Sequence, residues 1–170
     1  MNTLFENLDD LTKYHSIRVA DLSKAIAKKL QISNIENVYE IAKFHDIGKQ
    51  LIDQSIILKP EKLTDEEFEI IKTHTKLGVK LMRDYMTEEH LKCILYHHEN
   101  VNGTGYYQKK DFEIPYVAKI IRITDVYDAL TSTRCYKDAY DKKDALFLMK
   151  NNVGQLFDND IFQVFLSLVS

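Results

Sequence analysis

Residues 115–132 read PYVAKIIRITDVYDALTS, and this stretch decides the fold. Pro115 suits the first turn of a helix, where its missing N–H group would have no partner in any case. Asp125 lies in the middle of that helix, within the apolar run from Ile120 to Val126. Because a buried carboxylate without a partner costs several kcal/mol, the helix must pack where Asp125 meets a cation or strong hydrogen-bond donors.

Helices are also predicted over most of the remaining chain. Apolar side chains recur at steps of three and four over residues 3–30, and shorter helices are expected over residues 35–45, 88–98, 142–152 and 158–167. Thr64 and Glu67 form a capping box that opens another helix, which reaches about Leu81. The chain has five glycines, two prolines, almost no strand-like alternation and no linker or repeat. We therefore expect an all-α bundle of about six to seven helices in a single domain over residues 1–170.

Composition excludes several classes of protein. The 170 residues include 23 Lys and Arg against 26 Asp and Glu, a net charge of −3, which argues against binding of a nucleic acid polymer by bulk charge. Apolar runs are too short to span a membrane, and the first residues lack the pattern of a signal peptide. Cys93 and Cys135 are isolated, so a reduced, cytoplasmic protein without disulfides is expected.

The residues next to the six histidines indicate what these histidines could do. His45 is followed by Asp46, and His97 by His98, in each case close to the end of a predicted helix. Adjacent residues of a helix point about 100° apart, so such pairs act together best where the helix ends. Imidazole and carboxylate ligands suit divalent iron, manganese, nickel and zinc, and a carboxylate beside a histidine can bridge two ions that activate a water.

Each of these residues also has a simpler interpretation on its own. His90 would be a solvated surface residue, and His15 and His74 would be hydrogen-bonded residues of the core. Asp125 would form a salt bridge to Arg122 or Lys119. Lys49 would interact favourably with the dipole at a helix C-terminus. Taken together, however, five separate helices each supply a polar group to an otherwise apolar face. That combination favours a metal centre.

The loop after His98 is unusual for a chain so poor in glycine. Gly103 and Gly105 fall within three residues and permit close approach of the backbone to a ligand. Tyr106 offers a ring or a hydroxyl group to a base or phosphate, and Arg134 and Lys137 are placed to hold phosphate. The simpler interpretation is a turn with aromatic anchors and a solvated pair of cations.

In this order along the chain, the motifs resemble an HD-GYP domain, a branch of the HD metal-dependent phosphohydrolases. The resemblance covers nearly the whole chain, and its most specific parts are the 97–106 loop and the 125–132 block. The motifs are HDIGK at 45–49, LTDEEFE at 63–69, HT at 74–75, HHE at 97–99, NGTGY at 102–106 and DVYDALTS at 125–132.

The resemblance implies an all-α fold of the HD type with a centre of two or three metal ions, iron or manganese first and nickel or zinc as alternatives. Asp46 would bridge the ions and act in catalysis together with Lys49, which would lie beside the scissile phosphate. The implied metal ligands are His15, His45, Asp46, His74, His97, His98 and Asp125. The implied substrate-binding residues are Lys49, Gly105, Tyr106, Arg134 and Lys137.

The chain departs from the family pattern at several positions. The usual Gly-Tyr-Pro is Gly105-Tyr106-Tyr107, which gives up the fixed φ of proline and predicts a softer loop. The usual basic residue after the Glu is Asn100, and the usual Asp before the first Gly is Asn102. Leu11 occupies the place where three-metal members carry a Glu, which favours two ions over three.

The expected activity is therefore hydrolysis of cyclic di-GMP, or a related cyclic dinucleotide such as cyclic GMP-AMP, to linear pGpG, GMP or both, by a water that two metal ions activate. Two alternatives stay open. The first is an HD phosphohydrolase of another nucleotide or phosphate ester. The second is a module that binds a cyclic dinucleotide or a protein partner without turnover. Oligomeric state is likewise open.

Overall fold

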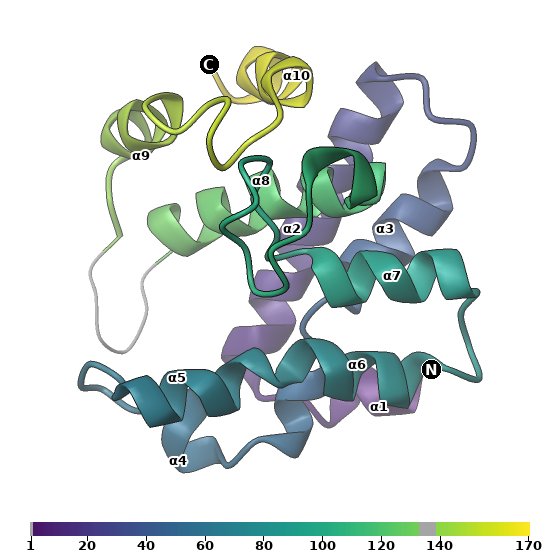
Figure 1. Cartoon of the computed structure of the whole chain (residues 1–170), viewed down its shortest axis with the longest axis vertical. Helices are drawn as coiled ribbons and strands as arrows, with labels where there is room; N and C mark the ends of the chain where they lie inside the picture. The colour runs from purple at the N-terminus through teal and green to yellow at the C-terminus, as the bar shows by residue number, and fades with distance from the viewer. Residues whose placement is uncertain (1, 133–138) are drawn as a thin grey trace.

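The computed structural model describes residues 2–132 and 139–170, and this part of the chain is helical, without strands (Figure 1). It contains ten α-helices and two 3₁₀ helices, more than the six to seven helices expected. The elements are α1 (Asn2–Glu6), α2 (Asp10–Lys29), α3 (Ile35–Lys43), η1 (Ile47–Leu51), α4 (Gln54–Ile57), α5 (Asp65–Lys72), α6 (His74–Met82), α7 (Glu88–Tyr96), η2 (Asp111–Glu113), α8 (Tyr116–Thr131), α9 (Lys142–Lys150) and α10 (Asn159–Val169).

The larger number of helices arises because two predicted helices are each broken once. The helix expected over residues 3–30 stops before Asp9, whose backbone is extended and whose side chain caps α2 by accepting from the Thr12 N–H at 2.9 Å. The helix opened by the capping box at Thr64 ends at Lys72, after which the Thr73 hydroxyl donates to a carbonyl oxygen of the preceding turn at 2.6 Å. In addition, the short helix α4 lies within residues 50–63, where no helix was predicted.

The bundle is organised around α2 and α8, which cross in the centre of the molecule (Figure 1). The N-terminal half of α2 packs with α3, α6 and α7 around one apolar cluster, in which Val19, Phe44 and Ile121 are fully buried. The C-terminal half packs with α8, α9 and α10 around a second cluster, which includes Ile26 and Phe162. Burial of these side chains supplies the main driving force for assembly and fixes how α2 meets α8.

Gly48 allows η1 and α6 to approach backbone to backbone. A Cβ atom on Gly48 would lie 2.0 Å from the carbonyl oxygen of His74 and 2.5 Å from the amide nitrogen of Gly78. Only glycine permits this approach, because any side chain would overlap backbone atoms. The contact sets the distance between Asp46, just before η1, and His74, the first residue of α6.

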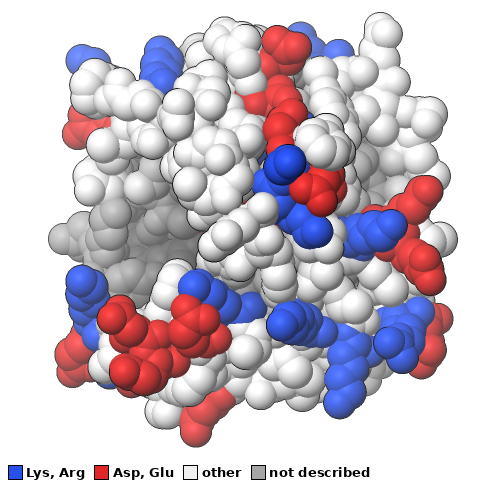
Figure 2. Space-filling view, in the orientation of Figure 1, with Lys and Arg blue, Asp and Glu red and all other residues white. Residues whose placement is uncertain are grey.

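The surface matches the near-neutral composition. On the face drawn in Figure 2, basic and acidic side chains lie next to one another rather than in a large patch of one sign. None of the helices in the described ranges is long and apolar enough to cross a membrane.

Candidate metal centre

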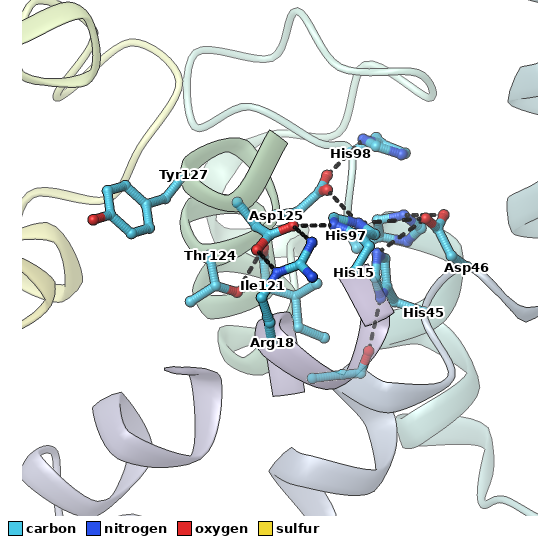
Figure 3. A network of polar contacts seen from close by, with 12 residues as sticks. His15, Arg18, His45, Asp46, His97, His98, Ile121, Thr124, Asp125 and Tyr127 are labelled. Carbon is cyan, nitrogen blue, oxygen red and sulfur yellow. Dashed lines mark hydrogen bonds and ion pairs between the residues drawn. The ribbon is translucent and has the colours of Figure 1, made fainter. Parts of the chain in front are cut away.

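The seven predicted metal ligands come together where five segments of the bundle meet (Figure 3). They are supplied by α2, the segment between α3 and η1, α6, the end of α7, and α8. They form two groups, and within each group the ligand atoms lie within 4.8 Å of one another. The first group is Asp46, His74, His97 and His98, and the second is His15, His45 and Asp125.

Asp46 lies between the two groups. Its Oδ1 is 3.3 Å from Nε2 of His74 and 4.0 Å from Nε2 of His97. Its Oδ2 is 3.3 Å from Nε2 of His45 and 3.6 Å from Nε2 of His15. Because each oxygen faces different histidines, this one carboxylate can serve two ions.

Three of the histidines are held in the same way. In each, Nδ1 donates a hydrogen bond of 2.7 Å to the carbonyl oxygen three residues earlier, at the end of a helical turn. The pairs are His45 with Ala42, His74 with Ile71 and His97 with Ile94. This bond fixes the tautomer, so the lone pair of Nε2 faces the centre, as metal-binding histidines require.

Asp128, for which no role was predicted from the sequence, performs a similar task for His15. Its Oδ2 accepts from Nδ1 of His15 at 2.7 Å, while Arg18 donates to the two oxygens at 2.6 and 2.9 Å. Asp128 lies one helical turn after Asp125, so both carboxylates share a face of α8. The spacing of three residues between Asp125 and Asp128 was the sequence feature that could have predicted this role.

The unsatisfied polar atoms of the cluster fit a metal. Nε2 of His15, Nε2 of His45 and Oδ1 of Asp46 are buried and have no hydrogen-bond partner of suitable geometry. Buried polar atoms are rarely left in this state, because losing water without a replacement partner is costly. Imidazole nitrogens and carboxylate oxygens are ligands for divalent transition metals, so the donor set matches such ions.

Protonation in the cluster is set by burial and by close charges. Burial lowers the pKa of His74 to about 4 and holds the pKa values of His97 and His98 well below the ordinary one, which keeps these imidazoles neutral. Burial opposes ionisation of Asp46, but Lys49 and His45 hold its pKa well below the usual range. Burial also works against a charged His15, yet the carboxylates of Asp125, 3.1 Å from Nε2, and Asp128, 2.7 Å from Nδ1, raise its pKa.

The glycine-containing loop covers one side of the centre. The buried carboxylate of Glu99 accepts from the backbone N–H groups of Tyr107 and Lys109, each at 2.7 Å. A Cβ atom on Gly105 would lie 2.4 Å from Cα of Glu99, so the close approach predicted there is a contact between backbones within the loop. The ring of Tyr106 stacks on that of His98, with 4.5 Å between the ring centroids.

Tyr107 occupies the position where we expected a softer loop. Its hydroxyl is 2.7 Å from Oγ1 of Thr75 on α6, and its ring meets that of Tyr96 edge to face at 5.7 Å. These contacts anchor the loop to α6 and α7, where a proline would have restricted only its own φ.

A cavity of about 730 Å³ opens directly over the two groups. Lys49, Tyr106 and Asp125 supply polar atoms to its wall, while Phe68 and Leu58 are among its apolar residues. Nζ of Lys49 lies 2.5 Å from Oδ2 of Asp46. This volume lies within the range of roughly 300–1,000 Å³ that is typical of small-molecule sites.

A model of the HD domain family matches residues 1–161. The chain belongs to the HD domain family. A cyclic di-GMP phosphodiesterase of Vibrio cholerae is 35% identical to it over 99% of this chain, and one of Thermotoga maritima is 34% identical over 99%. The chain spans 38% and 47% of the lengths of these two relatives.

Solved structures share the fold of this HD domain. Bd1817, a HDG"Y"P protein from Bdellovibrio bacteriovorus, superposes with a TM-score of 0.74 at 21% identity, covering 96% of this chain and 55% of that one. The HD domain of the Listeria monocytogenes phosphodiesterase PgpH in complex with cyclic-di-AMP gives 0.67 at 22% identity, covering 98% and 93%. Together these matches confirm the predicted HD-GYP membership and all-α HD fold.

Other predicted residues of the HD domain have different outcomes. Arg134 and Lys137 lie outside the described residues. His90 is separate from the cluster and is 3.4 Å from the Asn37 side chain. The alternative salt bridge of Asp125 is wrong for Lys119, whose ammonium lies 2.6 Å from Asp111 instead.

Proposed function

We propose that this HD domain is a metal-dependent cyclic dinucleotide phosphodiesterase that hydrolyses cyclic di-GMP, or a related cyclic dinucleotide, to linear pGpG, GMP or both. The observation that carries the proposal is the convergence of seven His and Asp ligands around Asp46 at the base of the cavity. The names of the relatives from Vibrio and Thermotoga support the same substrate class. We further propose that residues 1–170 act as a single domain.

The donor set fits two divalent ions, with iron or manganese first and nickel or zinc as alternatives. Such ions would polarise a phosphodiester and lower the pKa of a water between them. Each of the two groups would hold one ion, with Asp46 shared. Leu11 lines the cavity near the centre and brings no carboxylate for a third ion.

The chain's own residues then have separate tasks. Lys49 lines the cavity beside Asp46, where its ammonium stabilises negative charge that develops on the phosphate during attack. Tyr106 presents an aromatic wall to the substrate, and Gly105 lets the loop fold closely enough to hold that ring. The predicted contacts of Arg134 and Lys137 with the dinucleotide belong to this proposal as well.

Elemental analysis of protein prepared without oxygen, together with a chromatographic assay on cyclic di-GMP, tests the proposal. We expect about two metal ions per chain and a linear product. Asp46→Ala is expected to lose both metal and turnover, while the exposed Asp84→Ala serves as the matched control and keeps both. A fully active Asp46→Ala protein, or wild-type protein that takes up no metal under any loading condition, contradicts the mechanism.

The Gly105-Tyr106-Tyr107 loop motivates a second candidate within the same chemistry. Because the loop forms part of the cavity wall, an altered loop changes which phosphate ester fits. A substrate panel of cyclic dinucleotides, mononucleotides and simple phosphate esters separates the two. Metal-loaded protein that cuts only the simple esters would favour the second candidate. A domain that binds without turnover is less well supported, because the ligand set is complete.

A further inference from the structure

Arg122 is a cation at the cavity that neither the metal centre nor the loop motif explains. It lies on α8, one helical turn before Asp125, and lines the cavity beside His98 and Tyr106. Its Nε donates to Oδ1 of Asn100 at 3.0 Å. Within residues 2–132 and 139–170, no carboxylate oxygen lies within 4.0 Å of its guanidinium group.

Arg122 therefore has no direct ion pair within the described residues, and the carboxylates of Asp125 and Glu99 act on its charge only at longer range. A guanidinium group carries five N–H donors, and the structure pairs one of them within the described part of the chain. The side chain is partly buried, and a cation that loses water without gaining a direct ion pair is costly. An anion in the cavity would form that ion pair through the paired N–H groups of the guanidinium fork.

Asn100 fixes the direction of this fork. While its Oδ1 accepts from Arg122, its Nδ2 donates to Oγ1 of Thr104 at 3.0 Å. Thr104 in turn donates to Oδ1 of Asn102 at 2.7 Å. Both ends of the buried Asn100 amide are thus engaged, and Nε of Arg122 is held so that its two Nη groups remain available to a ligand.

Three Lys and Arg side chains of the described residues line the cavity, and they stand in different relations to the His and Asp cluster. Arg18 is paired with Asp128. Lys49 contacts Asp46, the carboxylate that lies between the two groups, whereas Arg122 forms no ion pair with Asp46 or Asp125. A cyclic dinucleotide carries two phosphates on one ring. Resting on the function proposed above, we propose that Arg122, positioned by Asn100, binds the substrate phosphate that is not being cut.

Steady-state kinetics of the metal-loaded protein test this assignment. Arg122→Gln is expected to raise the KM for cyclic di-GMP about 10- to 100-fold, as for loss of a charged hydrogen bond, with metal content unchanged. Arg122→Lys keeps the positive charge but not the paired N–H groups, so its KM is expected to lie between those of wild type and Arg122→Gln. Arg83→Gln removes an exposed arginine outside the cavity and is the matched control, with a KM equal to that of wild type.

A substitution at Asn100 separates substrate binding from a structural role. Asn100→Asp places a carboxylate against the guanidinium group and neutralises it, so the KM is expected to rise although stability to urea is kept. If Arg122 served only to hold α8 to the loop, this variant would leave the KM unchanged. The Asn100→Asp variant also tests the role of Arg122 in substrate binding if Arg122→Gln does not fold.

Substrates of different composition decide which part of the dinucleotide Arg122 meets. Bis(p-nitrophenyl) phosphate has one phosphate, so Arg122→Gln should reduce kcat/KM for it at least tenfold less than for cyclic di-GMP. Equal loss for both would overturn the assignment, as would an unchanged KM or a fall in metal content that matches the fall in activity. Loss of affinity for cyclic di-GMP but not for cyclic di-AMP would place Arg122 on the base instead. Wild-type protein that cuts no cyclic dinucleotide would refute the proposed function itself.

Discussion

Gly48→Ala is the substitution for which the structure gives the sharpest expectation. The added methyl group would lie 2.0 Å from the carbonyl oxygen of His74, 2.5 Å from the amide nitrogen of Gly78 and 2.8 Å from the carbonyl carbon of His74. All three atoms belong to the backbone, so η1 and α6 must move apart by more than an ångström to restore van der Waals distance. Overpacking of this kind costs about 1–3 kcal/mol or more, and we expect at least the upper value here because no side chain can yield.

The same movement separates Asp46 from His74, whose ligand atoms are 3.3 Å apart. Gly48→Ala is therefore expected to lower the free energy of unfolding of the metal-free protein by about 3 kcal/mol, as measured by urea denaturation. The variant is also expected to contain less metal than wild type in elemental analysis. Gly78→Ala is the matched control, because its methyl group would meet a side-chain atom of Ile94 at 3.1 Å. Alanine is favoured over glycine in a helix by about 1 kcal/mol, which offsets that closer contact. Full metal binding by Gly48→Ala at wild-type stability would refute this reasoning.

Three further changes have defined outcomes. Asp128→Asn is expected to lower metal affinity roughly 10- to 100-fold in competition with a chelator, because it weakens the support of a ligand without removing one; a change below twofold would contradict this. Tyr107→Phe is expected to lower the free energy of unfolding in urea by about 1 kcal/mol, since the hydrogen bond to Thr75 is lost, and unchanged stability would show that the bond contributes nothing. Burial raises the pKa of the Cys93 thiol from 9.0 to about 12, so the folded state keeps it protonated and loses stability as the pH rises above 9. In a Cys135→Ser variant, iodoacetamide at pH 8 should therefore modify the remaining thiol only after unfolding, and rapid modification of native protein would contradict its burial.

The helical class and the grouping of seven His and Asp side chains were predictable because their signals are local or cumulative. Each histidine alone is ambiguous, but pairs at helix ends combined with a carboxylate in an apolar helix are hard to explain without a cation. The breaks at Asp9 and Thr73 were not predicted, because side-chain capping competes with an apolar periodicity that continues through both positions. Their effect was to change the number of helices and not their packing.

The parts of the site that the sequence left open depend on distances through space. Asp128 and Arg122 share a helix face with Asp125, but only the fold shows that one supports His15 and the other turns toward Asn100. A softer loop was predicted because Tyr107 lacks the fixed φ of proline. In the structure, the Tyr107 hydroxyl instead anchors the loop through its hydrogen bond to Thr75 on α6. Such pairings join residues far apart in sequence, and periodicity carries no information about them.

The spread of the ligands along the chain has a consequence for folding. The donor set begins at residue 15 and ends at residue 125, so the two ions proposed above would cross-link most of the polypeptide in its native arrangement. Ions that bind only the folded form add about 2.7 kcal/mol each at a free concentration one hundred times the dissociation constant. For a domain whose total stability is of the order of 5–15 kcal/mol, that is a large share. If the ions bind as proposed, a chelator would remove this stabilisation as well as the activity, and the chain would be digested faster by a protease.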